Sequence, residues 1–219
     1  MPVAEFKPVG IIDYGIGNLF NVKRAVRHVG ASPHFVRTGM DLLSAPALIL
    51  PGVGAFPDGV KGLRDAGLWE PLVEYAKSGR PLLGICLGMQ LLFESSSEFG
   101  MHGGLGIIPG HVGPLENKQH ELNLKIPHIG WAEITPPADR EVSWQDTILR
   151  DVKPTDSVYF VHSYAAIPAV PTMVLANGAY GPTLFCAAVR SKNVTGCQFH
   201  PERSGEVGLS ILRNFFANE

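Results

Sequence analysis

Hydrophobic positions in the first hundred residues form two alternating patterns. Short runs of mainly apolar residues, typical of buried strands, predict strands at 9–13, 35–36, 47–50 and 81–85. Between them, apolar residues recur every three or four positions, which predicts helices at 19–29, 58–66 and 68–77 and another that begins at 89–93. Strands that alternate with helices in this way predict parallel βαβ units with right-handed crossovers.

The pattern changes after Gly100, where glycines and prolines separate a series of short strand-like segments. These segments are expected at 106–108, 131–134, 158–161, 173–175, 185–189 and 195–199, before an amphipathic helix at 208–216. No linker or internal repeat divides the chain. We therefore expect one α/β domain over 1–219, with a mostly parallel central sheet, flanking helices and β-rich additions.

Composition narrows the classes of protein to which the chain can belong. Apolar residues make up 45% and charged residues 17%, which excludes an intrinsically disordered chain. Eighteen basic and 20 acidic residues give a net charge of −2, which argues against a general nucleic-acid binder. No apolar run approaches the roughly 18 residues of a membrane span. We expect no nucleic-acid partner and no association with a membrane.

Three cysteines, Cys86, Cys186 and Cys197, lack the spacing of a zinc site or a disulfide framework. We therefore expect no metal and a reducing, cytoplasmic setting, in which a free thiol can do chemistry. Cys186 and Cys197 lie in apolar strand candidates, where they are expected to be core thiols.

Cys86 stands at the centre of a Gly84-Ile85-Cys86-Leu87-Gly88 segment between a predicted strand and a predicted helix. The same G-x-nucleophile-x-G spacing forms the strained elbow of α/β hydrolases. In such an elbow the sulfur projects beside the amino end of the helix, which favours the thiolate, and the N–H of Leu87 is placed to bind an oxyanion. The alternative is a buried cysteine between two packing glycines.

His200 and Glu202 flank a proline just after the last predicted strand. In an extended segment, residues two apart point to the same side, so the carboxylate can orient one nitrogen of the imidazole while the other faces a nucleophile. Taken alone, this pattern also fits a surface turn with an acid near a histidine by chance.

A Pro51-Gly52-Val53-Gly54 turn follows the third predicted strand, where glycines let backbone N–H groups point into a site. Alone it would be an ordinary βα turn. Together, the three segments lie at the carboxyl ends of predicted parallel strands, where open α/β sheets place their sites. A cysteine, a histidine and a glutamate with two oxyanion donors form a complete set for acyl transfer.

Two of these segments also carry a family resemblance. Residues 84–94 (GICLGMQLLFE) and 198–202 (QFHPE) resemble the class I glutamine amidotransferases. More narrowly, the chain resembles the glutaminase subunits of imidazole glycerol phosphate synthase. Four further blocks match that subfamily in order, at 13–19, 51–56, 127–131 and 159–164, and the resemblance spans about 9–216.

The resemblance implies hydrolysis of L-glutamine to glutamate and ammonia, with no cofactor. Cys86 would attack the side-chain amide, His200 would take the thiol proton and later protonate the ammonia, and Glu202 would orient His200. The oxyanion donors would be the N–H groups of Leu87 and of Gly52 or Val53. The resemblance also places four residues near the glutamine: Gln90, Glu98, Ser163 and Tyr164.

The resemblance further implies a protein partner. In this family, ammonia passes to a separate cyclase with the (β/α)8 barrel fold, which makes imidazole glycerol phosphate and an aminoimidazole carboxamide ribotide in histidine biosynthesis. Such a barrel needs roughly 250 residues, so we expect another polypeptide and a heterodimer. Family positions that meet the partner are Asn18, Trp131, Tyr159 and Arg203, the last standing where the family pattern has lysine.

Two other functions stay open at this point. The chain could be a glutaminase subunit of a synthase that makes anthranilate, guanylate or pyridoxal phosphate, although several of these favour histidine where this chain has Met89. It could also be an inactive binding module on the same fold, which should have lost part of the triad. His162 is expected to be structural, because His200 has a carboxylate of its own.

Overall fold

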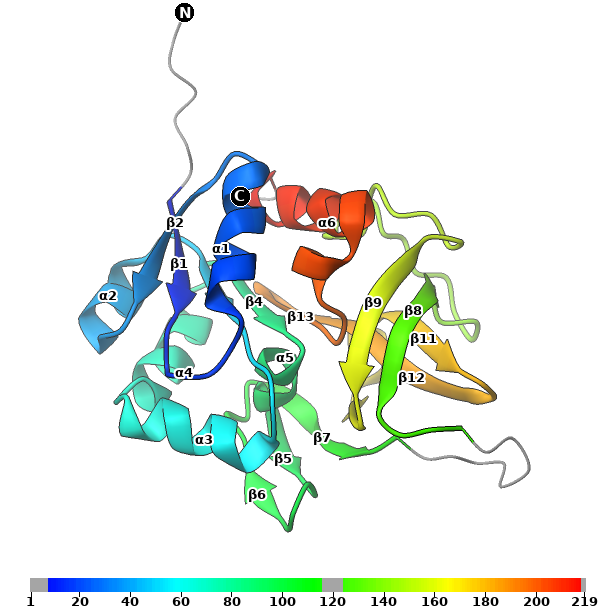
Figure 1. Cartoon of the computed structure of the whole chain (residues 1–219), viewed down its shortest axis with the longest axis horizontal. Helices are drawn as coiled ribbons and strands as arrows, with labels where there is room; N and C mark the ends of the chain where they lie inside the picture. Colours follow the sequence, from blue (N-terminus) through cyan, green and yellow to red (C-terminus); the bar gives the residue numbers. More distant parts are fainter. Residues whose placement is uncertain (1–7, 116–123, 218–219) are drawn as a thin grey trace, which may run out of the picture.

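The computed structural model describes residues 8–115 and 124–217, and a nine-stranded sheet runs through its centre (Figure 1). The strand order is β2-β1-β3-β4-β13-β12-β11-β8-β9. The first five strands are parallel to one another: β2 (Ser32–Val36), β1 (Pro8–Ile12), β3 (Leu48–Leu50), β4 (Leu82–Ile85) and β13 (Val194–Cys197). The remaining four continue antiparallel: β12 (Thr183–Ser191), β11 (Val174–Tyr180), β8 (His128–Thr135) and β9 (Ser157–His162).

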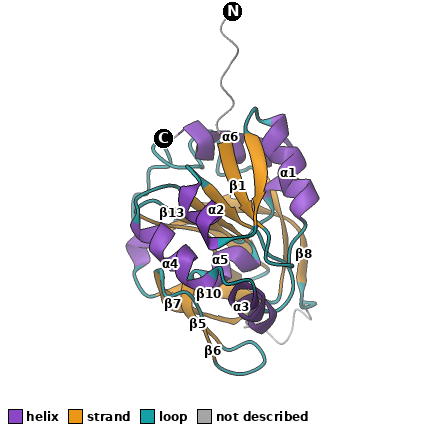
Figure 2. Cartoon of the chain, turned by 90° about the vertical axis from the view of Figure 1, so that its left-hand side faces the viewer, coloured by secondary structure: helices purple, strands orange, loops and turns teal. Residues whose placement is uncertain are grey.

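Helices cover both faces of the parallel part of this sheet (Figure 2). Val9 and Ile11 of β1 point to the face that packs on α1 (Leu19–His28) and α6 (Gly205–Ala217). Ile12 points to the opposite face, as successive residues of a strand do. That face packs on α2 (Gly39–Ser44), α3 (Phe56–Asp65), α4 (Trp69–Lys77) and α5 (Leu87–Leu91).

A smaller sheet packs on the same side as α5. Its order is β10-β7-β5-β6, with β10 (Tyr164–Pro168), β7 (Ile108–Pro114), β5 (Phe93–Ser96) and β6 (His102–Gly103). Two short 3₁₀ helices, η2 (Pro171–Met173) and η3 (Pro201–Arg203), complete the described elements. None of the helices in the described ranges is both long and apolar enough to cross a membrane.

The structure confirms the expected class, an α/β fold with a central sheet, flanking helices and β-rich additions, and corrects several boundaries. The helix expected from 89–93 is only five residues long, and Phe93 instead begins β5, where it pairs with Ile108. The strand expected at 106–108 begins only at Ile108, and the one expected at 195–199 ends at Cys197, before the turn to His200. The short elements α2, β5, β6 and β10 were not predicted.

The topology places the three chemically interesting segments side by side. Strands β3, β4 and β13 are neighbours, with Leu50 beside Gly84, and Ile85 beside Cys197. The residues that follow these strands are Pro51, Cys86 and Gln198. The carboxyl ends of three adjacent parallel strands therefore form one edge at which a site can be assembled.

Candidate active site

Cys86 occupies a strained turn between β4 and α5. Its φ of 54° lies in the left-handed region, which is uncommon for a residue with a side chain. A Cβ atom on Gly88 would collide with the carbonyl oxygen of Leu50, and one on Gly84 would lie 2.8 Å from the carbonyl oxygen of Gly88. Only glycine therefore allows the elbow to pack this closely against β3 and α5.

The elbow opens into a cavity of about 280 Å³. Eight of the sequence-predicted site residues line it together: Val53, Cys86, Leu87, Gln90, Glu98, Ser163, Tyr164 and His200. Of the ten residues predicted for catalysis, oxyanion binding and glutamine contact, two do not line it. Glu202 lies behind His200, and Gly52 packs against Leu87, where an added Cβ would lie 2.8 Å from the Leu87 Cβ.

His200 is held by both its side chain and its backbone. Its Nδ1 lies 2.8 Å from Oε1 of Glu202, and the two side chains are only 4% and 2% exposed. The His200 N–H donates to the Tyr159 carbonyl at 2.9 Å, and the Ser204 hydroxyl donates to the His200 carbonyl at 2.6 Å. Nε2 of His200 is buried without a hydrogen-bond partner among the described residues.

The electrostatics of this pair favour a charged imidazole. Burial alone would lower the pKa of His200, but the neighbouring Cys86 sulfur and the Glu202 carboxylate outweigh burial and raise the pKa to about 10. A thiolate beside an imidazolium is the reactive form of a catalytic cysteine. The arrangement can therefore supply a nucleophile and a general acid at neutral pH.

A hydrogen-bonded ladder of two side-chain amides, those of Gln198 and Gln90, ends at the Cys86 sulfur. Gln198, fully buried, has its Nε2 3.7 Å from the Cys86 Sγ and accepts a hydrogen bond from Gln90 Nε2 at 3.0 Å. Gln90 Nε2 also donates to the Tyr164 carbonyl at 3.0 Å. Sequence reasoning missed this contact of Gln198, whose only signal was its position two residues before His200.

His162 also lines the cavity and is held by hydrogen bonds within the protein. Its Nδ1 lies 3.0 Å from the Tyr164 carbonyl, which can only accept, so Nδ1 carries the hydrogen. Its Nε2 lies 3.2 Å from Nδ1 of His128, which is also buried. Burial, opposed by the bond to Tyr164, lowers the pKa of His162 to about 4, so the ring is neutral at pH 7.

Two further contacts shape the mouth of the cavity. The Tyr14 hydroxyl donates to the Pro51 carbonyl at 2.8 Å and thereby fixes one peptide of the glycine-rich turn. Oε2 of Glu98 accepts from the N–H of Phe56 at 2.8 Å, at the start of α3. Glu98 is therefore anchored beside the cavity through one oxygen.

Three of the four expected interface residues form one stack. The Trp131 ring lies 6.0 Å from the Tyr159 ring in an edge-on arrangement, and the Arg203 guanidinium lies 4.1 Å from the centre of the Tyr159 ring. The fourth, Asn18, is exposed and caps α1 by accepting from the N–H of Asn21 at 3.4 Å.

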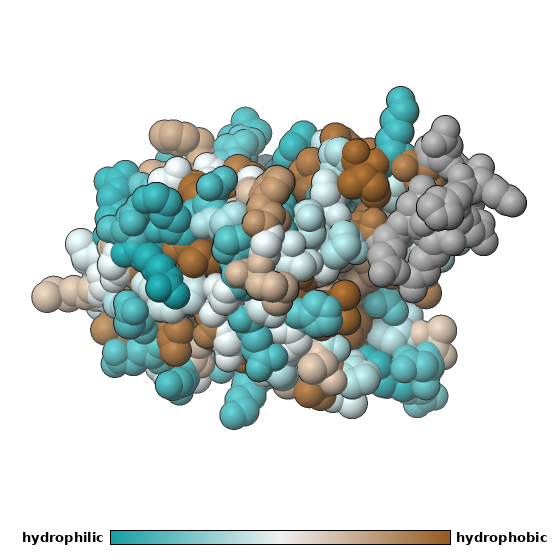
Figure 3. Space-filling view, turned by 90° about the horizontal axis from the view of Figure 1, so that it is seen from below, coloured by the Kyte–Doolittle hydropathy of each residue, from teal (hydrophilic) through white to brown (hydrophobic). Residues whose placement is uncertain are grey.

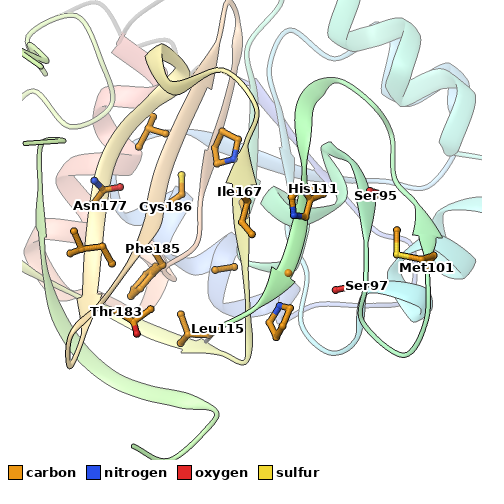
Figure 4. Close-up of a pocket in the computed structure, with 17 residues that line it drawn as sticks. Ser95, Ser97, Met101, His111, Leu115, Ile167, Asn177, Thr183, Phe185 and Cys186 are labelled. Carbon is orange, nitrogen blue, oxygen red and sulfur yellow. The ribbon is translucent and has the colours of Figure 1, made fainter. Parts of the chain in front are cut away.

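A larger cavity, of about 650 Å³, lies away from Cys86 between the two sheets (Figure 4). Phe185 and Cys186 from β12 and His111 and Ile167 from the smaller sheet contribute to its lining. Cys186 is buried, and burial raises its pKa to about 12, which disfavours the thiolate at neutral pH. Within residues 8–115 and 124–217, no group of three or more His, Cys, Asp or Glu side chains is placed to hold a metal ion.

Comparison with known proteins gives a consistent result along almost the whole chain. Residues 10–218 match the family model described as glutamine amidotransferase class-I. Imidazole glycerol phosphate synthase subunit HisH 1 of Legionella pneumophila (strain Lens) is 48% identical over 208 residues, which cover 94% of this chain and 97% of the relative. The chloroplastic imidazole glycerol phosphate synthase hisHF of Arabidopsis thaliana is 46% identical over 209 residues, 94% of this chain but 33% of that protein.

Solved structures share the fold at lower identity. The crystal structure of a glutamine amidotransferase superimposes with a TM-score of 0.71 at 20% identity, covering 96% of this chain and 97% of that one. That likeness extends to the fold alone. The family model and the sequence relatives indicate the same family.

Proposed function

The chain belongs to the class I glutamine amidotransferases, and among them to the HisH subunits of imidazole glycerol phosphate synthase; from this premise we propose that Cys86, His200 and Glu202 hydrolyse the side-chain amide of L-glutamine. The observation that carries the proposal is the unpartnered Nε2 of His200 in a cavity that Cys86 also lines, with Nδ1 held by Glu202. The alternative of an inactive binding module loses support, since all three side chains are present and clustered.

The first half of the reaction forms a thioester. The Cys86 thiolate attacks the amide carbon of glutamine, and the carbonyl oxygen becomes an oxyanion. His200, having taken the thiol proton, passes it from Nε2 to the leaving nitrogen, so that the C–N bond breaks and ammonia departs. Glu202 keeps Nδ1 protonated throughout and stabilises the imidazolium.

The second half restores the enzyme. His200 takes a proton from water, the resulting hydroxide attacks the thioester carbon, and glutamate leaves as Cys86 regains its proton. In both halves we assign the oxyanion to the N–H of Leu87 and to that of Gly52 or Val53. Leu87 and Val53 line the cavity beside Cys86, and Gly52 packs on Leu87, which supports this assignment.

Recognition of glutamine is assigned to four other residues that line the cavity, Gln90, Glu98, Ser163 and Tyr164. Glu98 is anchored through one oxygen, which leaves the other for the substrate's α-ammonium group. Gln90 uses its amide nitrogen twice within the protein, which leaves its carbonyl oxygen for a substrate N–H. The backbone of Ser163 and Tyr164, which lines the same cavity, would hold the α-carboxylate end.

Ammonia released here would be consumed by a cyclase partner. We infer a separate cyclase with the (β/α)8 barrel fold, with imidazole glycerol phosphate and an aminoimidazole carboxamide ribotide as its products. The Arabidopsis relative supports a second unit, because the chain accounts for only 33% of that protein. The stack of Trp131, Tyr159 and Arg203 and the exposed Asn18 are the proposed contact surface. A free catalytic thiol suits a reducing compartment such as the cytoplasm.

An alkylating glutamine analogue tests the proposed nucleophile. Peptide mass spectrometry of the treated chain should find the label on Cys86, with Cys186 and Cys197 unlabelled because both are buried away from the cavity. Excess L-glutamine should protect Cys86. Labelling mainly at Cys197, or labelling that glutamine does not slow, would refute the assignment.

A further inference from the structure

Two groups lie within hydrogen-bond distance of the Cys86 Sγ among the described residues. The Val161 carbonyl lies 3.8 Å away and can only accept, so it binds the sulfur when the sulfur carries a proton. Gln198 Nε2 lies 3.7 Å away and can only donate. These two neighbours therefore favour opposite ionisation states: a thiolate loses the first contact and strengthens the second.

The direction of the Gln198 amide is determined by its surroundings. The Tyr164 carbonyl must accept, so the nitrogen of Gln90 faces it. The same nitrogen lies 3.0 Å from the Gln198 side chain, which must present its oxygen there. Reversing the Gln198 amide would set two N–H₂ groups against each other and turn a carbonyl oxygen towards the sulfur.

The far end of this ladder is also fixed. The Tyr164 carbonyl accepts a second hydrogen bond from His162 Nδ1 at 3.0 Å, and His162 in turn meets His128 at 3.2 Å. Gln90 and Gln198 are 5% and 0% exposed, so water does not compete for their amide groups. The ladder is therefore a rigid, polarised element and not a set of exchangeable surface contacts.

We propose that Gln198 is a catalytic residue of the glutaminase reaction, which donates an N–H to the nucleophilic sulfur, and that Gln90 is a positioning residue that fixes the donating end of the Gln198 amide. This inference rests on the proposed function of Cys86. The donor stabilises the thiolate and restrains the position of the sulfur. The proposal also gives Gln90 a role besides substrate contact, because without the Gln90 amide the Gln198 amide is free to rotate.

Two variants separate this role from packing. Gln198→Glu keeps the shape and the acceptor for Gln90, but replaces the donor towards the sulfur with a carboxyl oxygen. Gln198→Met keeps the approximate length and removes both hydrogen bonds. Asn214→Asp is the matched control: Asn214 is a fully buried amide on α6 that donates to the Ile148 carbonyl, so it measures the cost of a carboxyl group in the core.

The rate of Cys86 alkylation by iodoacetamide is measured against pH for each full-length chain. Both Gln198 variants should move the midpoint of the profile upward by about one pH unit or more, Gln198→Glu the further. With the cyclase partner bound, kcat for glutamine should fall about 10- to 100-fold, as for loss of a hydrogen bond to a charged group, with a smaller change in KM. Asn214→Asp should leave the midpoint where it is.

Unchanged midpoints and a kcat within about twofold of wild type in both Gln198 variants would overturn the inference, even if the variants were less stable. The proposed function fails on a different observation, namely glutamine turnover that survives in Cys86→Ser. If Cys86 reacts in the wild-type chain and the Gln198 variants show the same pH profile of alkylation, only the role of Gln198 is rejected.

Discussion

At the scale of single residues, the two nitrogens of His200 differ in their surroundings. Nδ1 is bound to Glu202, and Nε2, which has no partner among the described residues, is the nitrogen that we propose transfers protons. Glu202→Gln keeps the size of the side chain but can present an N–H to Nδ1. This favours the tautomer of His200 that carries its hydrogen on Nε2 instead of Nδ1. We predict a fall in kcat of about 10²- to 10⁴-fold, measured as glutamate release with the partner bound. Glu206→Gln, an exposed change on α6, should have no effect.

Glu202→Gln should also change the alkaline side of the pH profile of kcat/KM. The Cys86 sulfur and Glu202 raise the pKa of His200 to about 10, so wild type keeps its general acid until the pH passes about 10. Without the Glu202 charge, this limb of kcat/KM should move to lower pH. A limb at the same pH in both proteins would show that Glu202 does not act on His200.

His162 predicts a dependence of stability on acid pH. Burial lowers its pKa from 6.5 to about 4, so the unfolded chain binds more protons between these two values. The free energy of unfolding should therefore fall as the pH drops from 6.5 through 4, by roughly 2–3 kcal/mol in total from this residue. Urea unfolding at a series of pH values measures the fall.

The variant His162→Asn should show a smaller fall, because the buried group that must be protonated is gone. His28→Asn, which changes an exposed histidine of α1, serves as the control and should keep the wild-type slope. A slope that is the same in all three proteins would contradict the assignment to His162.

At the scale of elements, the elbow depends on the absence of a side chain at Gly88. An added Cβ would collide with the Leu50 carbonyl of β3. We predict that Gly88→Ala lowers the free energy of unfolding by more than about 3 kcal/mol or shifts the elbow enough to abolish alkylation of Cys86. Gly103→Ala, whose Cβ would meet nothing within 4 Å, should change stability by less than about 0.5 kcal/mol. Equal melting temperatures for the two variants would contradict this account of the elbow.

The parallel half of the fold was predictable because its strands are continuous apolar runs between helices of regular spacing. Strand β1 and helix α1, with Asn18 as its cap, agree closely with the prediction. The smaller sheet was not predictable, because its strands depend on distant partners. Phe93 continues the apolar run of α5, and only its pairing with Ile108 makes it a strand.

The grouping of the candidate site residues was easier to predict than the contacts that support them. Cys86 and His200 come within a few residues of the ends of neighbouring strands, so local spacing and topology were enough to bring them together. Gln198 and Tyr14 act through contacts with Cys86 and Pro51. Such contacts join residues tens of positions apart and depend on which way a side chain turns, which spacing does not encode.

At the scale of the whole molecule, the proposed function requires a surface that binds the cyclase partner. The face seen from below in Figure 3 mixes hydrophobic and hydrophilic residues without one continuous apolar area. We propose Trp131, which is 56% exposed and stacked on Tyr159, as the anchor for the partner.

We predict that Trp131→Ala weakens binding of the cyclase partner by about 30-fold or more, as measured by titration calorimetry. The rate at which the isolated chain is alkylated at Cys86 should stay the same, because the change is outside the cavity. Met40→Ala removes an even more exposed apolar side chain, on α2, and should leave binding unchanged. Equal weakening by both variants would argue against a local contact at Trp131.

The central claim, that Cys86 generates ammonia for a partner, is tested most directly by comparing two nitrogen sources in the assembled complex. Formation of imidazole glycerol phosphate is measured with L-glutamine and, separately, with ammonium salts, for wild type and for Cys86→Ser. The account predicts that Cys86→Ser loses glutamine-dependent synthesis by at least about 10³-fold, while ammonia-dependent synthesis continues at the wild-type rate. Glutamine-dependent synthesis that persists in Cys86→Ser would contradict it.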